Sequence, residues 1–162
     1  RYTKDFARLD APAGGSAPGN DNQGFYAAAD TMLTSAPHDP LRGISAGARI
    51  AYADPACNTF TWFASASLTD IGFWAARPQD KAGIGLIYAA SGAPFRRGQA
   101  LQGLAARPNE WVVEATWRAP LTPWLALQPD VQLIRNPQFA PEHRSALVWG
   151  LRLEISGGLG GS

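Results

Sequence analysis

The sequence has few charged residues and no excess of either sign. Charged side chains make up 17% of the 162 residues, and the formal net charge is +1. An average soluble domain contains roughly 25% charged residues. A protein that binds nucleic acid through its phosphates needs a basic surplus. The composition therefore argues against a nucleic-acid partner.

Long hydrophobic runs are also missing, although hydrophobic residues make up 46% of the chain and six of them are tryptophan. No uninterrupted apolar run approaches the roughly 18 residues that a membrane helix needs. This excludes a helical membrane protein. It does not exclude a membrane β-barrel, because barrel strands alternate in polarity and leave only a weak hydropathy signal.

Cysteine is nearly absent. Cys57 is the single cysteine, so neither an intrachain disulfide nor a cysteine-based metal cluster can form. We expect it to be a small, half-buried side chain rather than a reactive thiol.

The two ends of the sequence set the expected boundaries of the folded part. The chain starts at Arg1 without an initiator methionine or a signal peptide, which indicates a processed chain or a fragment. The final GGLGGS, residues 157–162, is expected to be a flexible tail or a cloning remnant. Residues 1–156 are then the segment that folds.

What the sequence does contain is a repeated alternation of apolar and polar residues, with 17 glycines and 13 prolines as punctuation. Alternation with a period of two predicts strands, and the punctuation predicts turns between them. Seven segments show the pattern: 24–33, 43–52, 59–68, 82–89, 110–119, 125–133 and 146–155. Residues 1–9 are expected to add a shorter eighth strand. The predicted fold is all-β and antiparallel.

The connections between these strands differ in length. Those at 77–80 and 120–124 are short, 136–144 is intermediate, and 10–23 and 90–109 are long. Short and long connections fall on opposite ends of the strands, apart from the short connection at 54–58. This asymmetry is typical of an outer-membrane barrel, which has tight periplasmic turns and longer external loops.

Aromatic residues concentrate near the predicted strand ends, where the interfacial girdles of a membrane barrel lie. They are Tyr52, Trp62, Trp74, Tyr88, Trp111 and Trp124, whereas Trp117 and Trp149 are more central. These patterns alone leave a second interpretation open, a soluble or surface-exposed β-sandwich with tryptophan in its core that binds carbohydrate or protein.

Several motifs resemble the carbohydrate-selective porins of the OprB family. They are YAAADTML, WAARPQDKAGIGLIYA, EATWRAPLTPWLALQPDVQLIRNP and ALVWGLRLEI, in the family's order from residue 24 to residue 155. The resemblance corresponds to the C-terminal half of a family member. It implies an outer-membrane barrel of about sixteen strands, of which about eight lie here. Such a protein passes glucose-type mono- and oligosaccharides by diffusion.

Two features depart from the family pattern. The chain has residues for only about half of such a barrel. Its last predicted strand ends at Ile155 and is followed by Ser156 and glycines, whereas outer-membrane strands usually end the chain on an aromatic residue. The partners that the resemblance implies are carbohydrate solutes, outer-membrane lipid and lipopolysaccharide. A homo-oligomer or a missing N-terminal half would complete the barrel.

If the apolar sides of the strands face lipid, the opposite sides line the lumen. The candidate sugar-binding residues there are Asp30, Arg49, Glu114, Arg118, Gln128, Asp130, Gln132, Arg152 and Glu154. Carboxylate, amide and guanidinium groups can bond sugar hydroxyls in place of water, and Tyr26 or Phe63 could stack on sugar rings. The structural alternative is that the charges of the Glu114–Arg118 and Arg152–Glu154 sets are ion pairs that satisfy one another across neighbouring strands.

The remaining candidate residues give weaker indications of function. Arg96 and Arg97 could form a positive constriction or contact lipopolysaccharide, but such a pair is more often a solvated loop. His38 and His143 lie in proline-containing connections without metal-ligand spacing. No nucleophile motif stands out, so we expect no enzyme, metal or cofactor. Pro129 interrupts its strand and belongs at an edge or a bulge.

Overall fold

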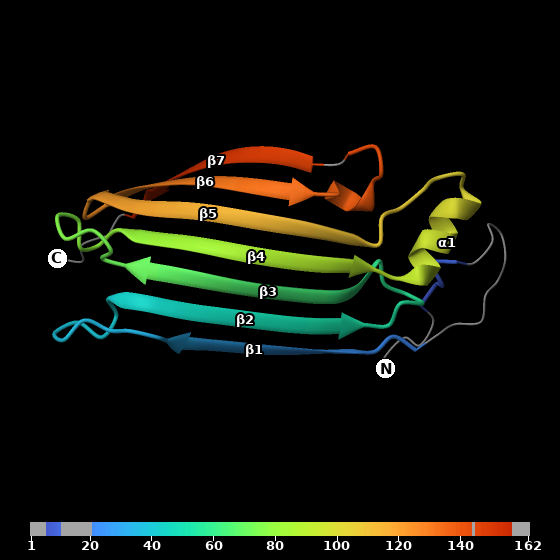
Figure 1. Cartoon of the computed structure of the whole chain (residues 1–162), viewed down its shortest axis with the longest axis horizontal. Coiled ribbons are helices and arrows are strands. Elements are labelled where there is room, and N and C mark those ends of the chain that lie inside the picture. The colour runs from blue at the N-terminus through green and yellow to red at the C-terminus, as the bar shows by residue number, and fades with distance from the viewer. Residues whose placement is uncertain (1–5, 11–20, 144, 157–162) are drawn as a thin grey trace, which may run out of the picture.

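The computed structural model describes residues 6–10, 21–143 and 145–156. Seven strands form one antiparallel sheet in sequence order, as Figure 1 shows. They are β1 (Gly24–Met32), β2 (Gly43–Ala53), β3 (Phe60–Ile71), β4 (Lys81–Ser91), β5 (Asn109–Thr122), β6 (Leu125–Arg135) and β7 (Ser145–Ile155). The predicted all-β fold is confirmed, and each of the seven predicted segments lies on a strand. Of the predicted eighth strand, residues 7–9 are not in a strand, and residues 1–5 are outside the described part.

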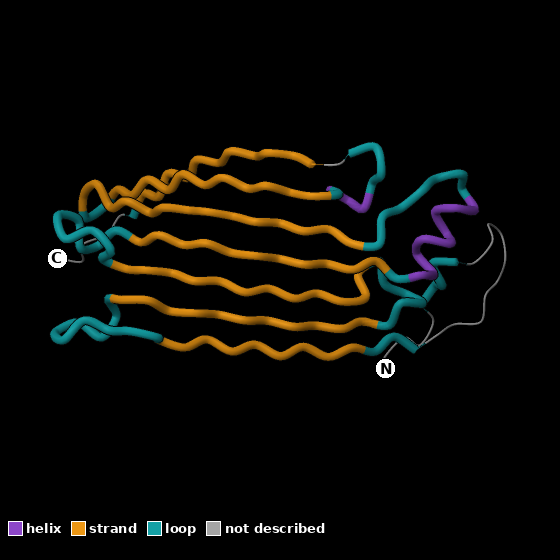
Figure 2. Tube along the Cα trace, viewed as in Figure 1, coloured by secondary structure: helices purple, strands orange, loops and turns teal. Residues whose placement is uncertain are grey.

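Each strand pairs with the next one along the chain, so the sheet is a simple meander (Figure 2). The connections 33–42, 72–80 and 123–124 lie at one end, and 54–59, 92–108 and 136–144 lie at the other. The predicted difference in length is therefore weaker than expected. Only the β5–β6 turn is tight, and residues 33–42 form a longer connection at the end that was predicted to carry short turns.

The register gives the sheet two chemically different faces. Directly paired residues of antiparallel strands share a face, and Asp30–Gly47, Gly85–Glu114 and Glu114–Gln132 are such pairs. Their face, here called the polar face, is half-buried over β3 to β6, whereas the apolar face is mostly exposed there. This is the reverse of a soluble domain, in which large apolar side chains are buried.

The large hydrophobic side chains show the same reversal of burial. All six tryptophans are exposed, and Trp149 retains 75% of its accessible surface. The buried apolar set within the described residues consists of four alanines and one phenylalanine: Ala56, Ala89, Ala119, Ala126 and Phe139. A β-sandwich needs a second sheet packed on the first, whereas the described strands form a single layer. The sandwich interpretation is therefore wrong.

Aromatic side chains gather at both ends of the apolar face. Phe25, Tyr52 and Trp62 form one cluster, with ring centroids 4.9 to 5.9 Å apart. Tyr88 and Trp111 pack together at the same end, 4.5 Å apart. Trp74 and Trp124 lie in the connections at the opposite end. The predicted placement of these aromatics near strand ends is confirmed.

One helix, α1 (Ala93–Leu101), interrupts the connection between β4 and β5, where the sequence predicted only a loop. Arg96 donates to the carbonyl oxygen of Ser91, and Arg97 pairs with Asp10 at 2.6 Å. These two arginines therefore lie on a helix and not in the predicted loop, although Arg97 remains exposed. No helix of the described residues combines the length and the apolar character that a membrane span requires.

The helix packs on segments that are distant in sequence. Phe139, the last residue of the short 3₁₀ turn η1 (Pro137–Phe139), is buried between Phe60 and Phe95. The backbone of Leu9 approaches Gly98 so closely that a side chain there would collide with it. These contacts join the N-terminal segment, the β4–β5 connection and the β6–β7 connection at one end of the sheet.

A buried carboxylate joins the β3–β4 connection to β5 at the other end of the sheet. Asp80 is 1% exposed and accepts hydrogen bonds from Arg77 Nε at 2.8 Å and from the Trp117 indole at 2.9 Å. Arg77 also donates to the carbonyl oxygen of Pro120 at 3.2 Å. The β3–β4 connection is thereby fixed to the end of β5.

Pro129 lies in β6, a central strand, and not at the predicted edge or bulge. The ladder pairs of β5 and β6 run as far as Thr116–Asp130 and resume at Ala119–Leu127, while Pro129 stays paired with β7. The missing N–H therefore affects only the β5 side. There, the Thr116 hydroxyl donates to the carbonyl oxygen of Pro129 at 3.3 Å. Cys57 is free and half-buried, as expected.

Candidate functional site

The register brings all nine predicted site residues onto the polar face. Asp30 and Arg49 come from β1 and β2, and the other seven come from β5, β6 and β7. They form two groups, one at each side of the sheet, separated by β3 and β4. The alternation within each strand predicts which of its sides is polar, and the pairing of neighbouring strands joins these sides into one surface.

The smaller group is an ion pair between β1 and β2. Arg49 Nη2 lies 3.3 Å from both carboxylate oxygens of Asp30. A Cβ atom at Gly47 would stand 2.5 Å from Asp30 Oδ1, so the carboxylate lies over this glycine. The absence of a side chain at Gly47 is what lets the pair settle close to the sheet. Both charged side chains remain exposed, which keeps the pair weak.

The larger group spans β5 to β7. Arg118 Nε pairs with Glu154 at 2.8 Å, so an ion pair between strands joins the two predicted sets, although it crosses β6 and does not link neighbouring strands. Glu154 stands opposite Ala126 of β6, whose short side chain leaves room for the pair to span this strand. Glu114 forms no ion pair with any other described residue.

Three polar groups surround the interruption of the ladder. Gln128 Nε2 donates to the Thr116 hydroxyl at 2.9 Å, and this hydroxyl donates to Pro129. Asp130 lies over Gly150 of β7, where any side chain would collide with its carboxylate. The amide and the carboxylate thus keep defined positions on the face.

A cavity of about 270 Å³ lies between the two groups, over β3 and β4. The residues that line it include Arg49 and Glu114 from the predicted set, together with Phe63, Ser65, Ser67, Gly83, Gly85 and Thr116. The candidate set had passed over the small residues because it was built on charged and amide side chains. Their signal was nevertheless in the sequence, since the alternation places both serines and both glycines on the polar side of their strands.

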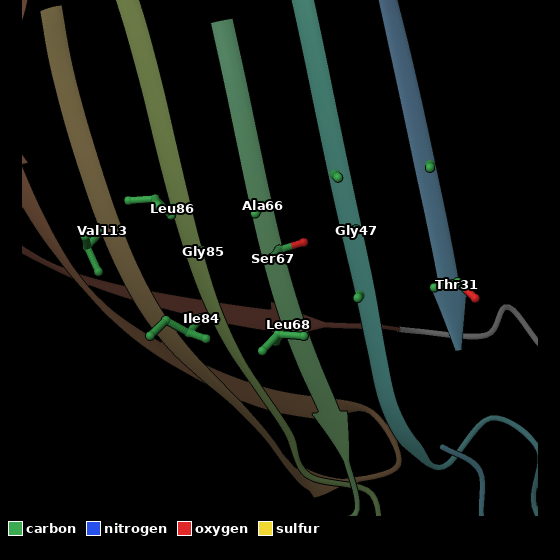
Figure 3. A pocket seen from close by; sticks show the side chains of 12 residues that line it. Thr31, Gly47, Ala66, Ser67, Leu68, Ile84, Gly85, Leu86 and Val113 are labelled. Atoms are coloured by element: carbon green, nitrogen blue, oxygen red, sulfur yellow. The ribbon is translucent and has the colours of Figure 1, made fainter. Parts of the chain in front are cut away.

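A larger hollow, of about 630 Å³, lies on the apolar face. Alanines of β1, β2 and β3 line it together with Leu68, Ile84, Leu86 and Val113, and Figure 3 shows these larger side chains along the three strands β3 to β5. Thr31 supplies a side-chain hydroxyl to it, whereas the Ser67 side chain belongs to the polar face. A solute rich in hydroxyls would find few partners there, so the smaller cavity on the polar face is the better candidate site.

The remaining candidates do not form a site. His38 and His143 lie in the connections 33–42 and 136–144, as predicted. Within the described residues, no three histidine, cysteine or acidic side chains gather as metal ligands would. The prediction that the protein needs no cofactor stays a prediction.

Comparison with known proteins agrees with the geometry. The family model described as "Carbohydrate-selective porin, OprB family" matches residues 3–156. Porin B of Pseudomonas aeruginosa is 26% identical over 144 residues, which cover 81% of this chain and 32% of Porin B. The high-pH structure of Pseudomonas putida OprB superposes with a TM-score of 0.80 at 22% identity, over 93% of this chain and 41% of that one.

These comparisons also show how much of each related protein the chain covers. It spans about a third of the length of Porin B and less than half of the OprB structure. The likeness to OprB shows the fold, so the single open sheet is part of the wall of an antiparallel β-barrel. Because the match of the family model extends over nearly the whole sequence, the chain belongs to the OprB family of carbohydrate-selective porins.

Proposed function

We propose that this chain forms part of the wall of an outer-membrane channel through which carbohydrates diffuse passively. The observation that carries the proposal is the inversion of the two faces: the large apolar side chains are exposed and the charged and amide groups share the half-buried face. A sheet built in this way suits lipid on one side and water on the other.

The apolar face has the features of a lipid contact. Strands of nine to fourteen residues are long enough to cross the hydrocarbon core when tilted. The aromatic clusters at the two ends fit the headgroup regions that flank an apolar band of about 25 Å. Outer-membrane lipid and lipopolysaccharide are therefore the proposed neighbours of this face, and the outer membrane is the proposed location.

The polar face has the features of a lumen for neutral solutes. Four carboxylates and three guanidinium groups are distributed over the nine candidate residues, so neither sign prevails. An anion channel would need an excess of arginine and lysine. Sugar hydroxyls both donate and accept hydrogen bonds, and this mixed surface offers both kinds of partner. Groups that replace part of the sugar's hydration only weakly allow it to pass and leave again, with no catalytic step.

The wall needs further strands. β1 and β7 are the edges of the sheet and do not pair with each other in the described part of the chain. Unpaired edges are not tolerated in the hydrocarbon core. The proposed partner of the two edges is the rest of a larger barrel, supplied by an N-terminal half of the protein or by further copies of this chain.

The test is transport by the protein that the native gene produces, purified from outer membranes and reconstituted in liposomes. We expect detergent-dependent solubility, heat-modifiable mobility on gels, and rapid swelling in glucose. An anionic solute of similar size should cause slower swelling. Recovery of the protein from the soluble fraction, or vesicles that stay impermeable to glucose, would refute the proposed function.

A further inference from the structure

The proposed function leaves open where on the wall a sugar is held, and the cavity over β3 and β4 answers this. We propose that it is a subsite for one pyranose unit of a neutral sugar, with Gly85 as its floor and Glu114 as its hydroxyl acceptor. This inference rests on the proposed function, because the cavity meets a solute only if the polar face lines a channel.

The size of the cavity fits a small ligand. Its volume of about 270 Å³ is just below the range of about 300 to 1,000 Å³ that is usual for drug-sized molecules. It extends from Arg49 on β2 to Glu114 on β5, three strand spacings or about 14 Å between backbones. One sugar ring with its hydroxyls fits in such a space. The side chains at the rim of the cavity can therefore contact only one sugar unit at a time.

The floor of the cavity is a glycine, and no neighbouring side chain requires a glycine at this position. Gly85 lies in the middle of β4, where glycine weakens a strand. Gly47 and Gly150 are explained by the carboxylates that lie over them. A Cβ atom at Gly85, in contrast, would have no neighbour closer than the carbonyl oxygen of Ala66 at 4.0 Å. Glycine inside a strand often marks a place where a ligand approaches the backbone closely, and here the space above it is empty of protein.

The groups around the floor match the chemistry of a sugar. Ser67 and Glu114 are the register partners of Gly85 on its two sides, so a hydroxyl and a carboxylate flank it directly. The carboxylate of Glu114 has no ion pair among the described residues and can accept from two adjacent hydroxyls. Phe63 lies further along β3 on the same face and offers an apolar ring to the C–H side of the sugar.

The same groups favour a neutral ligand. The guanidinium group at the cavity, on Arg49, is held by Asp30 at 3.3 Å from both oxygens, so its charge is already balanced. The unpaired Glu114 disfavours an anion in the cavity. A neutral hexose therefore meets no electrostatic penalty here.

The first test adds a side chain at Gly85, on the floor of the cavity. Gly85→Val should fold normally, because the added carbons enter open space and valine suits a strand. Ala146→Val is the matched control, since Ala146 is on the polar face of β7 and away from the cavity. In planar bilayers with the protein from the native gene, we expect glucose to block the ion current of the wild type with saturation. Gly85→Val should raise the half-blocking concentration at least tenfold, and Ala146→Val should leave it unchanged.

The second test concerns the acceptor and the shape of the ligand. Glu114→Gln keeps the size of the side chain and removes its charge, and we expect the half-blocking glucose concentration to rise about fivefold. Mannitol, an open-chain hexitol, should block the wild type less well than glucose, and Gly85→Val should remove this preference.

The outcomes separate the two proposals. A wild type that passes no glucose refutes the proposed function. A wild type that passes glucose without saturable block, or a Gly85→Val variant that behaves like Ala146→Val, refutes the subsite and leaves the channel intact. Equal block by glucose and mannitol also contradicts a pyranose subsite.

Discussion

The assignment of the two faces can be tested with two neighbouring valines on β5. Val112 lies on the polar face between Ile87 and Ile134, and Val113 lies on the apolar face between Leu86 and Leu133. Replacing each by arginine makes the same chemical change one residue apart. If the apolar face meets lipid, Val113→Arg should be much more destabilising than Val112→Arg.

The expected difference follows from depth in the bilayer. Val113 is two residues beyond Trp111, about 7 Å along the strand, and thus lies well inside an apolar band of about 25 Å. Arginine on a lipid-facing strand costs about 2–4 kcal/mol at the midplane and about 0–1 kcal/mol at the interface. An intermediate depth gives about 2 kcal/mol, or about a thirtyfold change in the folding equilibrium.

Val112→Arg places its charge between two carboxylates of the same face. Glu110 and Glu114 are two residues away on either side, so their side chains point in the same direction. The variant loses apolar contact with its two isoleucine partners but gains these acidic neighbours. We expect a cost below about 1 kcal/mol.

The assay is reversible unfolding of the native-gene protein in phosphatidylcholine vesicles, with the free energy of unfolding obtained by extrapolation from urea. In water the order of the two costs would be reversed, because Val113 is 41% exposed and Val112 is more buried. Equal costs, or a greater cost for Val112→Arg, would refute the lipid-facing assignment.

Three further predictions concern the two ends of the sheet and its edges. Asp80→Ala should lower the free energy of unfolding by about 2 kcal/mol in urea titrations, because it removes the acceptor of the Trp117 indole; Trp117→Phe should account for about half of this loss, and an unchanged midpoint in Asp80→Ala contradicts the role of the carboxylate. Hydrogen bonds from Arg97 and Arg8 hold the pKa of Asp10 below its usual value, so this contact should stabilise the fold above about pH 4 and weaken as the pH falls through the lowered pKa. An NMR titration should show that the pKa of Asp10 rises in Arg97→Met. An unchanged pKa in this variant would contradict the role of Arg97. This chain alone, with the open edges of β1 and β7, should not make liposomes swell in glucose; swelling would show that its strands close into a channel.

The strands were predictable because their signal is local. A strand with different surroundings on its two sides alternates in polarity with a period of two, and this is readable from one segment at a time. Glu114 and Thr116 could be assigned to one side of β5 without knowledge of its neighbours. The meander then pairs each strand with the next, so the local assignments combine into a single polar face.

The ion pairs were not predictable because they depend on the register of several strands. Arg118 meets Glu154 across β6, which requires both ladders to be in place and a small residue, Ala126, between them. The sequence indicated that these charged residues pair between strands, but it could not show which of them meet, because residues four apart on one strand stand about 13 Å from each other. The pair also leaves Glu114 without an ionic partner among the described residues, which is what makes it a candidate acceptor.

The helix α1 was missed for a related reason. Its nine residues include a proline and a glycine, which indicated a turn or loop, although its alanine, arginine, glutamine and leucine residues favour a helix. It is held by contacts from far away in the sequence: Arg97 with Asp10, and Phe95 with the buried Phe139. Such tertiary contacts provide most of the stability of a short helix, and no local pattern reports them.

Pro129 joins the two halves of this reasoning, because its effect depends on the face that its neighbours occupy. A proline in a central strand leaves a gap in the ladder, and inside a bilayer no water would be present on the lipid side to fill it. In β6 the gap faces β5, where the Thr116 hydroxyl bonds the proline carbonyl and is itself bonded by Gln128. Both side chains come from the polar face. A wall with one polar face can therefore accept a proline that a uniformly apolar sheet could not, and the polar residues beside it serve the backbone as well as any solute.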